Sequence, residues 1–342
     1  MNRNPVFDEV KGFAIWLVVL GHLVSQVGNK TVICISFFHM PVMIFISGYF
    51  FYYSMSKYNN RSDLIVHKFK SLVIPYISWS AIALLFNVGI NLHAGLFSKK
   101  SFMCELVDIF FYSRSVWYLI ILFLSFIIFL ISEKISEIIH INFFVTLLII
   151  WIGVSIYGPN ELFAFYKFKW LFLFMIAGYE CAKHNIIERI QGSIKASILG
   201  LIIFGWVVWC LYLKEYFEQY ITGNYKSVES GLFGLIYYVI SFYSIIIIFL
   251  FFKDNIGTKI KQYFANIGKL SMDIYVIHMF PLKLIQLIFP INMFSKLGEI
   301  ESTIIIYVIM GIVDFIIIGI IKYMYNNWLE KMKVYRMIMG KF

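Results

Sequence analysis

A lysine and a histidine stand at the two ends of an apolar stretch near the start of the chain. The stretch reads KGFAIWLVVLGH, from Lys11 to His22. On a helix, eleven residues of separation bring the two side chains to about 20° from eclipsed and about 16 Å apart along the axis. Asp8 lies one turn before Lys11 and can pair with it. His22 is therefore a candidate general base, and a histidine that only bonds a neighbouring helix is the structural alternative.

The next apolar stretch carries a second histidine and a serine. It contains FFHMPVMIFISGYFF, in which His39 precedes a proline at an early helical position. Ser47 and Gly48 form a patch of small residues where another helix can approach closely. Because His22 and His39 would enter the same half of a bilayer on consecutive spans, the two imidazoles favour a shared site.

A third set of polar residues lies in LSMDIYVIHMFPLKLIQLIF and in the stretch after it. Ser271, Tyr275 and His278 fall on one helical face, and Asp273 falls on another. This stripe is suited to lining a cavity. Asp314 is the most deeply placed carboxylate, and we expect it to meet a cation or an imidazole, either in a structural pair or in a catalytic one.

Membrane-spanning helices must position these residues. Of 342 residues, 61% are hydrophobic and 14% are charged, a composition that a soluble domain of this size could not hide from water. A helix of roughly 20 apolar residues crosses a bilayer. We predict an all-α polytopic membrane protein with ten transmembrane helices and both termini cytoplasmic. The predicted spans are residues 9–27, 33–54, 72–92, 116–132, 141–157, 163–181, 194–213, 231–252, 268–289 and 302–324.

The distribution of basic residues supports this orientation. Assigned to their nearer side, the 29 lysines and arginines divide into 19 on the cytoplasmic side and 10 on the opposite side. The densest cytoplasmic stretches are KYNNRSDLIVHKFK, KDNIGTKIKQYFANIGK and the tail from Lys331 to Lys341. Such stretches also attract anionic lipid headgroups. The net charge of +10 therefore indicates a lipid bilayer as partner and argues against nucleic acid.

Other common chemistries have no sequence signature in this chain. The four cysteines form no C-x-x-C pair and no metal-ligand spacing, so we expect no metal and no bound cofactor. Gly-rich phosphate loops, G-x-S-x-G elbows and H-E-x-x-H motifs do not occur. No cleavage site follows the first span, so we expect it to stay in the membrane. We expect residues 1–342 to form a single integral-membrane domain without a fused soluble domain.

Five motifs resemble the successive motifs of the membrane acyltransferase-3 family. They are DEVKGFAIWLVVLGH, FFHMPVMIFISGYFF, HKFKSLVIPYISWS, VWYLIILF and LSMDIYVIH, and they span roughly residues 5–280. This family includes the bacterial O-acetyltransferases of O-antigens, capsules and exopolysaccharides and the fucose 4-O-acetylase-like proteins. The resemblance implies a ten-span fold in the bacterial inner (plasma) membrane and an O-acetyltransferase activity.

The resemblance also assigns roles to particular residues. The family's basic residue, ten intervening positions and histidine correspond to Lys11 and His22, which implies that His22 is essential for acyl transfer. Lys11 and Asp8 complete the catalytic assignment. The residues assigned to the acceptor or to support of the site are His39, Ser47, Trp117, Ser271, Tyr275, His278 and Asp314.

The acyl donor implied by the resemblance is cytoplasmic acetyl-CoA, bound as a substrate. Family members carry an R-x-x-R pair before the third span that is thought to meet this donor. Here Lys68 takes the first position and Ser71 the second, with Lys70 beside it. Lysine is a point charge and arginine a bidentate fork. We expect Lys68 and Lys70 to contact the donor phosphates.

The implied acceptor is a hydroxyl of a cell-envelope glycan or of its lipid-linked sugar precursor. His22 would take the hydroxyl proton during attack on the thioester. His39 or Ser271 would orient the acceptor, and Asp314 or Asp8 would hold an imidazole in the useful tautomer. Residues 214–230 are rich in tyrosine and acidic groups, which suits either sugar binding or a solvated loop with interfacial aromatics.

A non-enzymatic flippase or exporter of a lipid-linked glycan is the alternative function. It would also place polar residues in a helical bundle, but it would need no acetyl-CoA. Transporters often contain broken helices at matching positions of two halves, and no such internal pairing is visible here. An enzyme of the same class that uses succinyl or another acyl donor is a third possibility.

Overall fold

The computed structural model describes residues 4–26, 35, 38–58, 60–93, 95, 97–113, 115–189, 228–288 and 299–341. Within these residues the chain is helical, and the helices are joined by turns without any strand. The all-α prediction is confirmed for this part of the chain. The predicted span 194–213 and most of the tyrosine-rich segment 214–230 lie outside the described residues.

Several helices have the length and composition of membrane spans. In the described part of the chain, four helical stretches are long and apolar enough to cross a bilayer, and two shorter helices are also apolar. These six stretches overlap the predicted third to sixth, eighth and tenth spans. The number ten and the side of the termini stay predictions. The four long stretches are Arg61–His93, Trp117–Ile139, Leu162–Lys183 and Thr303–Lys331, and the shorter two are Phe143–Tyr157 and Tyr237–Lys253.

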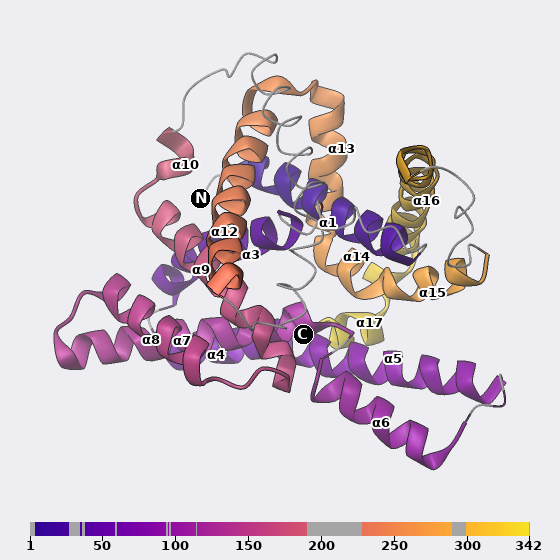
Figure 1. The fold of residues 1–342 in the computed structure, drawn as a ribbon, viewed down its shortest axis with the longest axis horizontal. Coiled ribbons are helices and arrows are strands. Elements are labelled where there is room, and N and C mark those ends of the chain that lie inside the picture. Colours follow the sequence, from indigo (N-terminus) through magenta and orange to yellow (C-terminus); the bar gives the residue numbers. More distant parts are fainter. Residues whose placement is uncertain are drawn as a thin grey trace. The chain divides into compact units, whose positions relative to one another are not determined.

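The chain divides into two compact units, of which the first comprises residues 1–46 and 185–324. It contains the start of α3 and most of α16. The remaining residues of both helices belong to the second unit. Figure 1 shows most of the first unit's helices in indigo and in orange to yellow, and the short α10 in pink. Its elements are α1 (Pro5–Gln26), α3 (His39–Lys57), α10 (Ile186–Arg189), α12 (Val228–Leu250), the π-helix η3 (Phe251–Asn255), α13 (Thr258–Lys269), α14 (Ser271–Ile277), α15 (Met279–Ile288) and α16 (Glu299–Asn327).

Helix α13 packs directly against α1 in this unit (Figure 1). It arises from the stretch KDNIGTKIKQYFANIGK, which the sequence indicated only as a basic cytoplasmic segment. A methyl group on Gly12 would overlap the backbone carbonyl oxygen of Phe264, and one on Gly268 would overlap that of Asp8. The two glycines therefore allow the two backbones to touch.

We expect Gly268→Ala to destabilise the first unit. The added methyl group meets a backbone carbonyl, which cannot rotate away as a flexible side chain could. Overpacking of this kind costs about 1–3 kcal/mol. Thermal unfolding of detergent-extracted protein should show a lower Tm. Gly319→Ala is the matched control, since a methyl group at Gly319 on α16 meets nothing within 4 Å. Equal Tm values for the two variants would contradict the close approach.

The predicted ninth span, 268–289, is not one continuous helix. It divides into α14 and α15, with His278 between them. Pro281 explains the break, because it has no N–H to donate to the carbonyl of Ile277 and its ring would clash with that carbonyl. The interruption leaves His278 at the junction of two helices.

The second unit comprises residues 47–184 and 325–342. Figure 1 shows most of it in purple to pink. Its elements, besides the ends of α3 and α16, are α4 (Arg61–Lys68), the π-helix η1 (Phe69–Val73), α5 (Ile74–His93), α6 (Lys99–Phe110), α7 (Trp117–Ile139), α8 (Phe143–Tyr157), the 3₁₀ helix η2 (Leu162–Ala164), α9 (Phe165–Lys183), the 3₁₀ helix η4 (Leu329–Lys331) and α17 (Lys333–Ile338).

The helix of the third span is longer than its apolar run. It begins at Arg61, so part of the segment that the sequence placed before the membrane is helical. Pro75 cannot donate to the carbonyl of Ser71, and the ladder widens into the π-helix just before it. Lys68 ends the helical turn before the π-helix, and Lys70 lies within the π-helix, ahead of the apolar part.

The small patch on α3 fulfils the role that its residues predicted. A methyl group on Gly48 would overlap the backbone carbonyl oxygen of Met175 on α9. The neighbouring Ser47 places its Oγ 3.0 Å from the hydroxyl of Tyr118 on α7. The close approach of α9 to α3 confirms the expectation for Gly48, and Ser47 lies in a helix-packing contact.

Candidate active site

The start of α1 holds the predicted ion pair. Lys11 Nζ lies 3.0 Å from Asp8 Oδ1, across one helical turn. The Asp8 side chain is 4% exposed and that of Lys11 is 18% exposed. A buried carboxylate of this kind is stabilised by its cation. This pairing was readable from the sequence because both residues belong to one helix.

The other end of α1 brings two histidines together. His22 lies on α1 and His278 at the junction of α14 and α15, and their ring centroids are 5.3 Å apart with 35° between the ring planes. His22 is exposed, whereas His278 is 1% exposed. One imidazole is therefore accessible and the other is held inside the protein beside it.

The backbone fixes the protonation pattern of His278. Its Nδ1 lies 2.7 Å from the carbonyl oxygen of Tyr275 and 3.2 Å from that of Ile274. A carbonyl oxygen only accepts hydrogen bonds, so Nδ1 carries the proton and, in the neutral ring, Nε2 carries a lone pair. Nε2 is buried and has no hydrogen-bond partner among the described residues. His278 thus offers an unused acceptor in the immediate surroundings of His22.

The rest of α14 is buried around this histidine. Ser271 begins the helix, and the Tyr275 ring lies 5.9 Å from that of His278. Asp273, which the spacing placed on a different face, is buried as well. Ser271, Tyr275 and His278 were predicted to line a cavity. They belong to a helical segment whose other face, with Asp273, is buried as well.

His39 has a similar local arrangement on α3. Its Nδ1 lies 2.6 Å from the carbonyl oxygen of Ile35, one turn earlier. By the same valence argument, Nδ1 donates and Nε2 is the basic nitrogen of the neutral ring. The side chain is half-buried. The Ile35 carbonyl therefore fixes the tautomer of the neutral His39 ring.

The expectation for Asp314 is wrong. The residue is fully buried on α16, but neither carboxylate oxygen has a hydrogen-bond partner among the described residues. The phenol of Tyr263 on α13 lies near enough to interact with the Asp314 carboxyl. The ring of the next residue, Phe315, lies 5.7 Å from Trp16 and 5.8 Å from Tyr263. Burial and the Asp314 carboxyl raise the pKa of Tyr263 to about 12. Among the described residues Asp314 bonds no imidazole, and backbone carbonyls orient that of His278.

In the second unit, the two lysines predicted to meet the donor differ in environment. Lys68 Nζ lies 4.5 Å from the ring centroid of Phe126 and 5.7 Å from that of Phe51. Its hydrogen bond to Ser54 Oγ is long, at 3.4 Å. The structure gives Lys68 no carboxylate within ion-pair distance in the described part of the chain, whereas Lys70 is exposed. Lys68 is therefore a half-buried cation with no counter-charge among the described residues.

Trp117 also has a cationic neighbour, which the sequence analysis missed. Lys167 Nζ, on α9, lies 4.0 Å from the centroid of the Trp117 ring on α7. The two residues are fifty positions apart, so spacing within one helix could not reveal the contact. The only sequence signal was a lysine inside a predicted span, which is a functional hypothesis by default.

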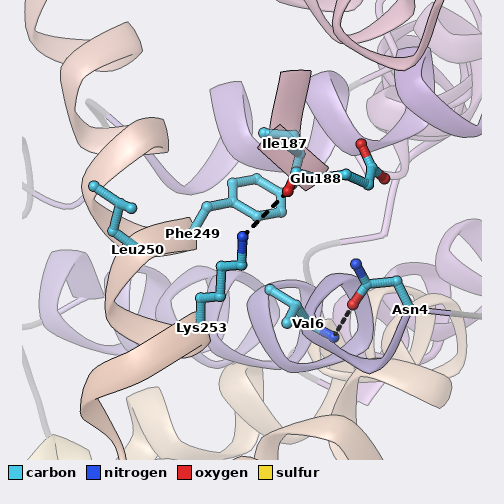
Figure 2. Close-up of a pocket in the computed structure, with 7 residues that line it drawn as sticks. All are labelled: Asn4, Val6, Ile187, Glu188, Phe249, Leu250 and Lys253. Atoms are coloured by element: carbon cyan, nitrogen blue, oxygen red, sulfur yellow. Dashed lines mark hydrogen bonds between the residues drawn. The ribbon is translucent and has the colours of Figure 1, made fainter. Parts of the chain in front are cut away.

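A cavity of about 200 Å³ lies elsewhere in the first unit (Figure 2). Its lining is mostly apolar, and Lys253 Nζ reaches the carbonyl oxygen of Glu188 at 3.5 Å. None of the predicted site residues lines it. Among the described residues, no group of three or more His, Cys, Asp or Glu side chains could hold a metal ion. The lining residues are Asn4, Val6, Ile187, Glu188, Phe249, Leu250 and Lys253.

Comparison with known proteins identifies the family. A family model described as an acyltransferase domain matches residues 4–323, nearly the whole chain. Neither the curated proteins nor the solved structures contain a match. The matched range includes His22 and His278 as well as Lys68 and Lys70. The chain belongs to the acyltransferase-3 family.

Proposed function

We propose that this protein is a membrane O-acyltransferase that moves an acetyl group from cytoplasmic acetyl-CoA to a hydroxyl of a cell-envelope glycan or of its lipid-linked precursor. Its family supports acyl transfer as the reaction class. The apolar helices support a membrane location, for which we propose the bacterial inner membrane. The observation that carries the residue assignment is the contact between His22 and His278.

His22 is the general base in this proposal. A sugar hydroxyl is a weak nucleophile at neutral pH, and an accessible neutral imidazole can remove its proton during the attack. The hydroxyl oxygen bonds to the thioester carbonyl carbon, and the carbon–sulfur bond breaks. Protonated His22 then returns the proton to the departing coenzyme A sulfur, so the enzyme ends the cycle unchanged.

His278 is a positioning residue for His22. Its Nδ1–H is held by two backbone carbonyls, so the lone pair stays on the buried Nε2. A centroid separation of 5.3 Å is short enough for a nitrogen of His22 to reach Nε2 of His278 directly or through one water. Such a bond would orient His22 and stabilise its protonated form during the reaction. The Lys11–Asp8 pair supports the other end of the same helix.

Lys68 and Lys70 recruit the donor in this proposal. Coenzyme A carries several phosphate charges, and a lysine is a suitable point charge for a phosphate oxygen. Lys68 is half-buried against aromatic rings and has no described acidic neighbour, so an anion would compensate its charge. Lys70 adds an exposed charge two residues later.

We expect the double variant Lys68→Ala, Lys70→Ala to raise the KM for acetyl-CoA about tenfold, the effect of losing about 1.4 kcal/mol of binding. The maximal rate should fall less, because these lysines contact the donor away from the reacting carbonyl. Lys134→Ala, an exposed lysine on α7, is the matched control. An unchanged KM in the double variant would assign both lysines to lipid headgroups or topology.

Analysis of envelope glycans tests the function itself. NMR and mass spectrometry of glycans from cells with and without this protein should reveal an ester that depends on the protein. The ester signal also identifies the acyl group and the modified hydroxyl. Identical glycan structures, with only their amount at the cell surface altered, would overturn the proposal in favour of an exporter.

A further inference from the structure

A lysine at the start of α9, in the second unit, has no counter-charge in the part of the chain that the structure describes. Lys167 Nζ lies 4.0 Å from the centroid of the Trp117 ring and 5.6 Å from that of Tyr166. It makes no ion pair and no hydrogen bond to any residue in the described ranges. The neighbouring Lys169 differs, because its Nζ donates to Gly158 O and to Asn160 Oδ1, both at 2.8 Å. Lys169 thus has two hydrogen-bond acceptors, whereas the described residues offer Lys167 only aromatic rings.

The position of Lys167 in its helix is unfavourable for a cation that the described residues leave without a counter-charge. It lies in the first turn of α9, where the helix dipole disfavours a cation and favours an anion. The backbone N–H groups of Phe165 and Tyr166 already donate to the carbonyl oxygens of Leu162 and Asn160, so the Lys167 ammonium, and not these groups, would bind an anion. The indole face of Trp117 attracts the ammonium and holds it in place. The group that would complete this arrangement is an anion with several acceptor oxygens.

The backbone around this pair is strained and tied together. Ser113, shortly before α7, has φ 52°, and Phe163 and Ala164, directly before α9, have φ 53° and 51°. Residues other than glycine seldom adopt this region, and they keep it only where their surroundings enforce it. The N–H of Phe163 donates to the carbonyl oxygen of Phe111 at 2.6 Å, which joins the two segments. This hydrogen bond fixes the segment before α7 against the segment before α9, and so holds the helix starts that carry Trp117 and Lys167.

We propose that Lys167, held by Trp117, binds the phosphate of a lipid-linked sugar and thereby selects the lipid-linked precursor as the acyl acceptor. This inference rests on the proposed function, which leaves the finished glycan and its precursor as alternatives. In the predicted topology, the starts of α7 and α9 face away from the cytoplasm. A phosphate anchored in the membrane would reach this level, whereas a neutral finished polymer offers no group for Lys167.

Binding of radiolabelled farnesyl phosphate, a short isoprenyl phosphate, tests the proposal. The full chain is placed in phosphatidylcholine nanodiscs, and farnesol serves as the probe without phosphate. We expect Lys167→Met to raise the Kd for farnesyl phosphate about tenfold, the effect of losing one charge-assisted contact. Lys167→Arg should stay near wild type, and it reports on folding as well as on charge. Lys100→Met, an exposed lysine at the start of α6, is the matched control.

Two results would overturn the inference. One is a Kd that Lys167→Met leaves unchanged while Lys167→Arg and Lys100→Met behave like wild type. The other is competition by phosphatidylglycerol at concentrations equal to the probe, which would make this a phospholipid headgroup site. Either result leaves acyl transfer intact as an activity. Conversely, Lys167-dependent binding without any transfer to glycans would refute the proposed function alone.

Discussion

Replacing His22 with alanine is expected to lower glycan acylation by about 10² to 10⁴, the range typical of a lost general base. The side chain is exposed, so its removal leaves no buried void. Protein level and monodispersity after detergent extraction should therefore stay near wild type. The measurement is the ester content of envelope glycans at matched protein level.

Two controls make the His22 result interpretable. His93→Ala removes another exposed histidine, at the end of α5, and should leave acylation unchanged. Lys11→Ala should reduce acylation less than His22→Ala if Lys11 only pairs with Asp8. Normal acylation by His22→Ala at normal protein level would refute the assignment of the base and direct attention to His278 and His39.

A substitution at His278 should separate positioning from folding. In His278→Asn, the amide N–H₂ can still donate to the carbonyls of Tyr275 and Ile274, but the acceptor at the Nε2 position is gone. We expect this variant to keep a Tm near wild type while its kcat falls about tenfold to hundredfold. That loss corresponds to about 1–3 kcal/mol for a lost buried hydrogen bond. The KM for acetyl-CoA should not change.

His278→Ala is the companion variant. It removes both the donor and the acceptor, so both the Tm and the kcat should fall. If the role of His278 were only to hold the backbone between α14 and α15, His278→Asn would restore kcat along with the Tm. Full activity in the asparagine variant would therefore contradict a role for Nε2.

Contacts within one helix were predictable from the sequence, whereas for contacts between helices the partner helix was not. The Lys11–Asp8 pair follows from a spacing of three residues, and the role of Gly48 follows from its small size. The pairing of His22 with His278 joins residues far apart in the chain. Periodicity gives the face of each residue on its own helix, but it does not say which helix that face meets.

Two further differences have identifiable physical causes. The break at His278 follows from Pro281, but the residues around it form one continuous apolar run, which by itself predicts a single span. Asp314 was expected to find a charged partner because an isolated buried carboxylate is costly. In the structure the Asp314 carboxyl lies near Tyr263 on α13, the helix that packs against α1 through the glycine contact.

Transfer of label from acetyl-CoA to glycan tests the central claim most directly. Inverted membrane vesicles that contain this protein are supplied with acetyl-CoA carrying a radiolabelled acetyl group. The account predicts that label appears in the glycan fraction as an alkali-labile ester, that it requires the protein, and that vesicles with His22→Ala lack it. Label that stays in acetyl-CoA, while glycan still crosses the membrane in a protein-dependent way, would contradict the account.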